Sequence, residues 1–101
     1  MPDNADSSTP QIEILNHKVN GRKVEVQFRA RVGTGRIASA EFSIDGGEWF
    51  LVFPSDGIAD SAQEEFQVTT PELPIGEHAL GLRAGDVVGN TGTAKLIVQI
   101  R

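Results

Sequence analysis

Four carboxylates fall within residues 56–65, and they are the best candidates in the chain for binding a metal ion: Asp56, Asp60, Glu64 and Glu65. Carboxylate oxygens are the ligands that calcium prefers in proteins. Their spacing, however, does not match the D-x-[DN]-x-[DN]-G pattern of a calcium-binding loop. We therefore expect a solvated acidic loop here rather than a cation site.

The histidines and serines also lack the spacing of a reactive site. The chain has no cysteine to join His17 and His78 in a zinc site, which needs four ligands. We expect His17 in a turn and His78 in a strand. No serine lies in the G-x-S-x-G pattern of a nucleophile elbow, and paired carboxylates for sugar hydrolysis need an open cleft that so small a domain seldom forms. The sequence thus predicts no enzyme, with no catalytic residue, metal site or cofactor.

Asp86 and Asn90 are a second place where oxygen ligands could gather around a cation. The segment between them supplies few further ligands. Asp and Asn side chains also close turns by hydrogen bonding to nearby backbone groups. Turn closure is the favoured interpretation for this segment.

Aromatic side chains at residues 49–53 are the strongest candidates for an interaction surface. In a strand, Trp49 and Phe50 must point to opposite faces, so one of them is either exposed or covered by a loop. An exposed ring can stack on a sugar or dock against a partner domain. The alternative is that the polar loop 54–63 folds back over it. The predicted interaction surface comprises Trp49, Phe50, Phe53, Asp56 and Asp60.

The elements that must position these side chains are β-strands. Apolar residues alternate with polar ones in several segments, and none of them keeps the i, i+3, i+4, i+7 apolar spacing of a helix. The expected strands lie near residues 12–14, 24–30, 38–44, 49–53, 66–68, 78–84 and 94–100. About seven short strands separated by turn signals are typical of an all-β, antiparallel sandwich of two sheets.

The phase of the alternation predicts which side chains face inward. In segment 24–30 the inward set begins with Val24 and ends with Ala30. In the third strand Ala38, Ala40, Phe42 and Ile44 are expected to share a face. A turn at Asp45-Gly46-Gly47 follows, and Trp49, Leu51 and Phe53 continue the alternation on the returning strand of the hairpin.

The composition limits the setting of the domain. Residues 1–10 are polar and are expected to form a disordered segment or linker, leaving residues 11–101 as one folded domain. No apolar run approaches the roughly 18 residues needed to span a membrane. A net charge of −5 argues against nucleic acid as a partner. We expect neither nucleic acid nor a membrane as a partner, and a monomer for the isolated domain.

The charges are unevenly distributed along the chain. Residues 37–82 hold nine acidic residues and no lysine or arginine, whereas residues 18–36 hold six of the nine basic residues. Either one face is strongly acidic, or the two segments meet and pair. The second is favoured, because Lys23 and Arg29 would face outward beside Glu65 if their strands are neighbours.

The segment 73–92 resembles the penultimate strand and following loop of fibronectin type III and related bacterial immunoglobulin-like domains. The matching residues are Leu73, Gly76, His78, Leu80, Leu82, Arg83, Ala84, Asp86, Gly89 and Asn90. The segment 43–49, SIDGGEW, resembles the S-V-D-G-G-x-W hairpin of bacterial members. His78 stands where the fibronectin type usually has a tyrosine that contacts upstream backbone, so such a polar contact is possible for His78.

This resemblance implies an immunoglobulin-like (fibronectin type III-like) antiparallel β-sandwich. It further implies a non-catalytic accessory, spacer or interaction module, part of a larger bacterial secreted or surface protein and thus extracytoplasmic. The implied partners are neighbouring domains of the same parent chain, or another protein or glycan. The alternative function is a carbohydrate-binding module that uses the Trp49 hairpin.

Overall fold

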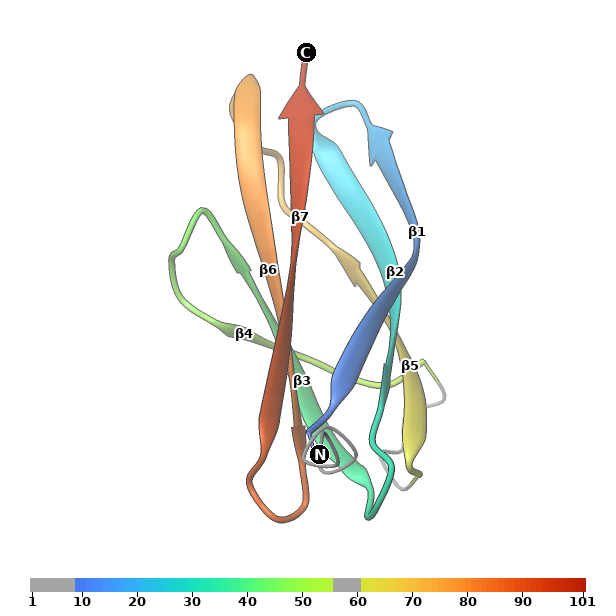
Figure 1. The fold of residues 1–101 in the computed structure, drawn as a ribbon. Coiled ribbons are helices and arrows are strands. Elements are labelled where there is room, and N and C mark those ends of the chain that lie inside the picture. The colour runs from blue at the N-terminus through green and yellow to red at the C-terminus, as the bar shows by residue number, and fades with distance from the viewer. Residues whose placement is uncertain (1–8, 56–60) are drawn as a thin grey trace, which may run out of the picture.

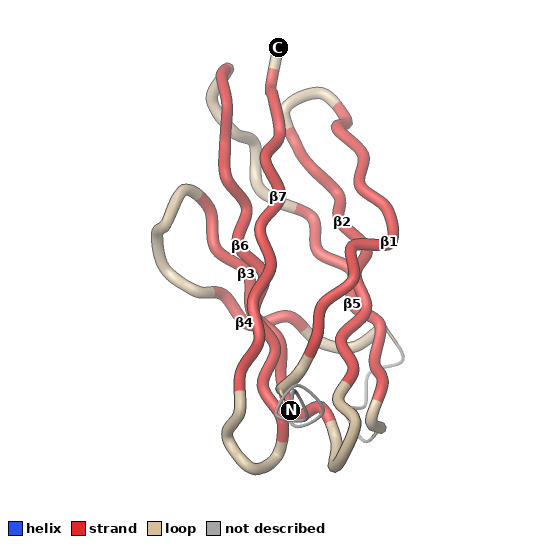
Figure 2. Tube along the Cα trace, viewed as in Figure 1, coloured by secondary structure: helices blue, strands red, loops and turns tan. Residues whose placement is uncertain are grey.

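The computed structural model describes residues 9–55 and 61–101, which form two antiparallel β-sheets packed face to face (Figure 1). Within those two ranges there is no helix, and Figure 2 shows strands joined by loops. The strands are β1 (Gln11–Asn20), β2 (Lys23–Arg31), β3 (Ile37–Ile44), β4 (Phe50–Val52), β5 (Gln63–Thr69), β6 (Gly76–Asp86) and β7 (Thr91–Ile100). The predicted seven-stranded sandwich is confirmed.

The strands are divided between a three-stranded sheet, β1-β2-β5, and a four-stranded sheet, β4-β3-β6-β7. The chain crosses between the sheets from β2 to β3, from β4 to β5 and from β5 to β6. Connections that pass from sheet to sheet are typical of Greek-key sandwiches. They place β6 in the interior of its sheet and leave β4 at an edge.

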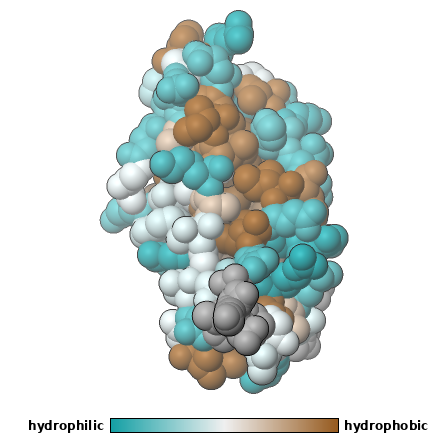
Figure 3. Space-filling view, in the orientation of Figure 1, coloured by the Kyte–Doolittle hydropathy of each residue, from teal (hydrophilic) through white to brown (hydrophobic). Residues whose placement is uncertain are grey.

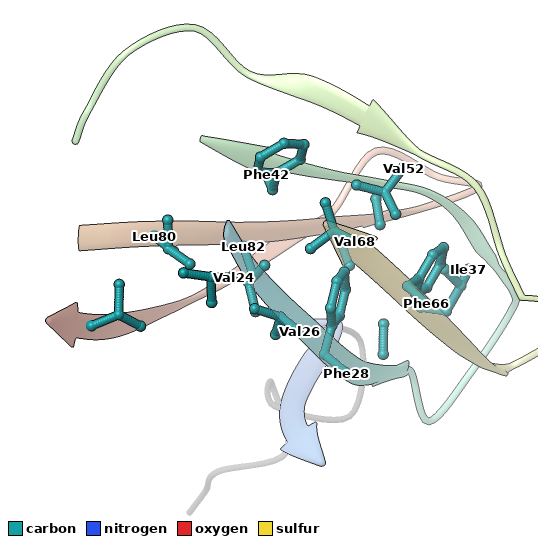
Figure 4. Close-up of a cluster of buried hydrophobic side chains, with 14 of the residues drawn as sticks. Val24, Val26, Phe28, Ile37, Phe42, Val52, Phe66, Val68, Leu80 and Leu82 are labelled. Atoms are coloured by element: carbon teal, nitrogen blue, oxygen red, sulfur yellow. The ribbon is translucent and has the colours of Figure 1, made fainter. Parts of the chain in front are cut away.

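The core lies between the sheets and follows the predicted alternation most closely in β2. Val24, Val26, Phe28 and Ala30 are all fully buried there. The Phe28 ring stacks on Phe66 of β5 with 5.1 Å between ring centroids. Figure 4 shows these side chains meeting residues from the opposite sheet. The core is therefore contributed by alternate residues of both sheets, as expected for a sandwich.

Strand β3 departs from its predicted phase at its beginning. Ala38 is exposed and Ile37 is fully buried, although the alternation predicts the reverse. The cause is an irregularity in the pairing with β6, where the register shifts between Ile37 and Ser39. An extra residue in one strand reverses the side-chain direction on either side of it, so Ala40 and Phe42 face inward as predicted.

Strand β1 is longer than the short predicted strand and pairs with β2 as far as Asn20. His17 therefore lies in a strand, and its expected position in a turn is wrong. A register shift between Ile14 and Asn16 lets the strand continue beyond its apolar half. At the other end, Pro10 is buried, and its carbonyl occupies the space that a side chain on residue 92 would need.

Opposite charges pair across the outer face of the three-stranded sheet. Arg29 of β2 lies opposite Glu65 of β5, and the guanidinium donates to the Glu65 carboxylate at 3.0 Å. The same guanidinium lies 3.4 Å from Glu13 of β1. These contacts, led by the Glu65 hydrogen bond, raise the pKa of Arg29. The predicted pairing of the basic and acidic segments is confirmed for this strand pair.

The long axis of the molecule measures 44 Å, and the two ends of the described chain lie at its opposite ends (Figure 1). The loop after β6 lies at the same end as the start of β1, and it exposes Val87 and Val88. In Figure 3 apolar residues also show between β7 and β1, where Ile12, Ile14 and Leu96 are only partly buried.

Candidate functional site

The turn after β3 positions the aromatic segment 49–53. Asp45 and Gly46 both have positive φ angles, 53° and 75°, which suit an aspartate and a glycine in a tight turn. The chain then returns as β4, with Phe50 opposite Phe42 and Val52 opposite Ala40. The predicted hairpin is confirmed, and its short returning strand forms the edge of the four-stranded sheet.

Asp45 is tied to β6 through both of its carboxylate oxygens. Oδ1 accepts a hydrogen bond from the Ala79 amide at 2.9 Å, and Oδ2 lies 2.6 Å from Nδ1 of His78. The other ring nitrogen of His78 lies 2.7 Å from the carbonyl of Pro74, four residues upstream. The expected polar contact from His78 to upstream backbone is therefore present. It joins the β3–β4 turn to the segment before β6.

Both ring nitrogens of His78 face acceptors, so the doubly protonated imidazolium is the form that can donate to both. The hydrogen bond to Asp45, followed by that to the Pro74 carbonyl, raises the pKa of His78 above its ordinary value of 6.5. The hydrogen bond from His78, followed by that from Ala79, lowers the pKa of Asp45 below 3.8. Both shifts favour the charged forms of the two residues, which together make an ion pair.

The raised pKa of His78 predicts that the domain loses stability as the solution becomes alkaline. The contribution is complete below the unfolded-state pKa of about 6.5 and is lost as the pH rises through the higher pKa of the folded state. Urea unfolding between pH 5.5 and 9, followed by Trp49 fluorescence, measures it. The wild type should lose stability with rising pH over this window, and His78→Gln should remove most of that slope.

His17→Gln is the matched control, because His17 is exposed on β1. This variant should keep the wild-type slope. Equal slopes for His78→Gln and the wild type would contradict the assigned ion pair. The lowered pKa of Asp45 affects stability in acid. Its contribution to stability is complete above the ordinary pKa of 3.8 and is lost as the pH falls through the lower pKa of the folded state.

Trp49 stands on the outer face of the four-stranded sheet. Its six-membered ring lies over Gly81 of β6, where a Cβ would come within 3.2 Å of Cη2 of the indole. The guanidinium of Arg83 covers the ring at 4.1 Å from its centroid, and Glu41 accepts from the Arg83 Nε at 2.8 Å. A glycine in a central strand usually marks such a close approach. The absence of a side chain at Gly81 therefore lets the indole pack directly on the backbone of β6.

Phe50 points to the other side of β4, as predicted, and packs against Phe42 with 5.5 Å between ring centroids. The residues expected to share a face with Trp49 do not face inward. Leu51 is 58 % exposed and Phe53 is 69 % exposed, while Val52 is the buried residue of the strand. The pairing of Val52 with Ala40 sets this phase.

The structure places the aromatic residues of the predicted interaction surface close together in the chain's β3–β4 hairpin. Trp49 is 37 % exposed and Phe50 is 47 % exposed, so neither is fully covered. Asp56 and Asp60 lie outside the described residues, as does half of the loop that was expected to fold over an aromatic ring. We define the β4 surface as Phe50, Leu51 and Phe53, the exposed apolar side chains along the sheet edge, with Phe50 on one face of the sheet and Leu51 on the other.

The acidic cluster is not a solvated loop over its whole length. Glu64 and Glu65 both belong to β5, where Glu64 is buried and Glu65 pairs with Arg29. The prediction is therefore wrong for these two residues, because β5 begins earlier than the apolar pattern indicates. Across residues 9–55 and 61–101, no three histidine or carboxylate side chains gather as a metal ion would require.

The loop after β6 is closed by Asp86, as the sequence predicts. One carboxylate oxygen accepts from the amides of Val88 and Asn90 at 3.1 and 2.8 Å, and the other accepts from the Asn90 side chain at 3.1 Å. Burial acts to raise the pKa of Asp86, but these hydrogen bonds, with that of Gly89, outweigh it and lower the pKa. The carboxylate is therefore used to hold the loop.

Comparison with known proteins identifies the fold. No protein-family model and no curated protein matches the chain. A chain of the sulfane dehydrogenase SoxCD from Paracoccus pantotrophus superposes with a TM-score of 0.72 and 18 % identity, over 91 % of this chain and 30 % of that one. The PKD1 domain of Vibrio anguillarum Epp gives a TM-score of 0.68 and 16 % identity, over 93 % of this chain and 95 % of that domain. At such identities the likeness concerns the fold, which is an immunoglobulin-like β-sandwich.

Proposed function

We propose that this chain is a non-catalytic interaction module of a larger bacterial extracytoplasmic protein, and that the β4 surface docks it onto a neighbouring domain. The observation that carries this proposal is the exposure of Phe50, Leu51 and Phe53 at a sheet edge. Exposed apolar side chains that lie close together on a surface often mark a site of contact with another domain. A neighbouring domain would bury these side chains.

The structural neighbours support a role within a larger chain. This chain spans less than a third of the SoxCD chain that it matches, and the Epp structure is described as one domain of that protein. Among the described residues no helix is long and apolar enough to cross a membrane. The bacterial extracytoplasmic location follows from the resemblance of segments 43–49 and 73–92, and it is part of the proposal.

Hydrogen–deuterium exchange tests the docking. In the full-length protein that contains this domain, backbone amides of residues 50–53 should exchange about tenfold more slowly than in the isolated domain, because docking covers the free edge of β4. Phe53→Ser should abolish this difference. Val88→Ser, in an equally exposed loop away from β4, should leave it intact.

Equal exchange of residues 50–53 in the two proteins would contradict the docking proposal. Loss of the protection in Val88→Ser but not in Phe53→Ser would also overturn it, since the docked surface would then be the loop after β6. If no larger polypeptide contains this domain, the accessory function fails as well.

A carbohydrate-binding function is the second candidate, and Trp49 is the observation that favours it. Its indole is partly exposed, stands on the outer face of the four-stranded sheet and lines a hollow with several small side chains. Indole rings provide an apolar face against which a sugar ring can pack.

A further inference from the structure

A hollow of about 420 Å³ lies beside Trp49 on the outer face of the four-stranded sheet. This volume falls within the range of small-ligand pockets, roughly 300–1,000 Å³. Most of its lining belongs to the three strands β3, β6 and β7. The lining residues used below are Ser43, Trp49, Ala79, Gly81, Thr93 and Lys95.

Strand β6 contributes only small residues to the lining, and the space above Gly81 is taken by the Trp49 indole and the Ser43 hydroxyl. Gly81 lies opposite Ser43 of β3 on one side and opposite Lys95 of β7 on the other. Ala79, the preceding outward residue of β6, adds only a methyl group. The indole of Trp49 therefore packs over β6, with Ser43 on one neighbouring strand and Lys95 on the other.

One face of the indole is already occupied. Arg83 stacks on the ring at 4.1 Å from the centroid but does not line the hollow. Its guanidinium is neutralised by Glu41, with 2.7 Å between Nη2 and Oε1. Arg83 thus orients the indole, and its charge is balanced by Glu41 rather than available to a ligand in the hollow.

Ser43 supplies a hydroxyl to the lining of the hollow. The residue as a whole is 4 % exposed, but its Oγ is not among the buried polar atoms without a partner in the described part of the chain. A hydroxyl that lines a hollow in this way can donate to or accept from a ligand. Thr93 of β7 also lines the hollow and carries a second hydroxyl.

Lys95 gives the hollow a positive charge. Unlike Arg83, it forms no ion pair with any part of the chain that the structure describes. Its ammonium can donate three hydrogen bonds and pairs well with a carboxylate. A single cation is well matched to one carboxylate, whereas a phosphate site is usually built from several donors.

We propose that this hollow binds a hexuronic acid residue of an acidic polysaccharide. The C–H face of the pyranose packs on the indole of Trp49, ring hydroxyls bond to Ser43 and Thr93, and the carboxylate pairs with Lys95. An apolar peptide side chain could pack on the indole, but it would offer no hydrogen-bond acceptor to Ser43 and no carboxylate to Lys95. The inference rests on the second candidate function and is independent of docking through the β4 surface.

Fluorescence titration tests the site directly. Trp49 is the only tryptophan and the chain has no tyrosine, so the indole emission reports this position alone. The probes are oligomers of galacturonate, glucuronate and mannuronate, each compared with its fully methyl-esterified form, which keeps the ring and removes the charge. At least one acid oligomer should shift the emission saturably, and its ester should bind about tenfold more weakly, a loss of about 1.4 kcal/mol.

Variants locate the contacts. Lys95→Gln should weaken binding of the acid about tenfold and leave the ester unchanged. Lys18→Gln, an exposed lysine on β1 of the other sheet, should bind like the wild type. Circular dichroism confirms that each variant remains folded.

Two results would overturn the proposal. If none of the acid oligomers changes the Trp49 emission, the hollow is not a sugar site. If an ester binds as tightly as its acid, or Lys95→Gln has no effect, the assignment of a carboxylate-bearing ligand is wrong. Neither result bears on the exchange experiment with Phe53→Ser, so failure of this site and failure of the docking proposal are distinguishable.

Discussion

Replacing Phe66 with alanine should lower the free energy of unfolding by about 3–5 kcal/mol. Phe66 is 1 % exposed and stacks on Phe28 at the centre of the sandwich. Removing the ring leaves a cavity between two sheets whose backbones are held apart by the remaining side chains. Because a domain of this size has a stability of roughly 5–15 kcal/mol, the variant should unfold at much lower urea concentration.

Phe53→Ala is the matched control for this measurement. It removes the same ring from an exposed position on the β4 surface and should change stability by less than about 0.5 kcal/mol in the isolated domain. A loss below about 1.5 kcal/mol for Phe66→Ala would mean that the sheets close over the cavity, contrary to the packed core described above.

Thr70→Val should cost about 2–3 kcal/mol although the two side chains have nearly the same shape. Thr70 follows β5 and is buried, and its Oγ1 accepts from the Val24 amide at 3.0 Å and donates to the Pro71 carbonyl at 2.8 Å. Valine leaves the buried amide of Val24 without its partner. The hydroxyl thus completes the hydrogen bonding of β2 where its pairing with β5 ends.

Thr69→Val separates this effect from a change in β-propensity. Thr69 is the neighbouring residue on the exposed face and should tolerate the same substitution to within about 0.5 kcal/mol. Urea unfolding of both variants provides the comparison. Equal losses at the two positions would contradict the role assigned to the Thr70 hydroxyl.

Sequence patterns predicted the parts of the fold in which polar residues alternate with apolar ones. In β2 the polar residues Glu25, Gln27 and Arg29 leave only one inward set, so the phase was unambiguous. The salt bridge between Arg29 and Glu65 followed once the neighbouring strands were assigned. Loop closure by Asp86 was also predictable, because it depends on groups only a few residues apart.

The sequence of β4 does not show in the same way which of its side chains face inward. Residues 49–53 are all apolar, so alternation starting at Trp49 and alternation starting at Phe50 fit the pattern equally well. Pairing with β3, which places Val52 opposite Ala40, decides between them. In β3 itself the shift after Ile37 is a property of its pairing with β6, and a single strand's sequence does not contain it.

The candidate site was predictable only as a group of aromatic residues. That Trp49 and Phe50 face opposite sides follows from strand geometry, but the hollow depends on residues far apart in sequence. Gly81 offered the one local signal, since a glycine within an alternating strand indicates a close approach. The pairing of Asp45 with His78 spans 33 positions and arises from the register of β3 against β6.

The placement of the chain ends has a mechanical consequence. Because the chain enters at one end of the 44 Å axis and leaves at the other, tension applied through the ends acts along the strands rather than across them (Figure 1). Hydrogen bonds between β1 and β2, and between β6 and β7, would then be loaded in shear, so that many must break together instead of one after another. A sandwich loaded in this direction should withstand a higher force before it unfolds than one whose strands are separated from one end.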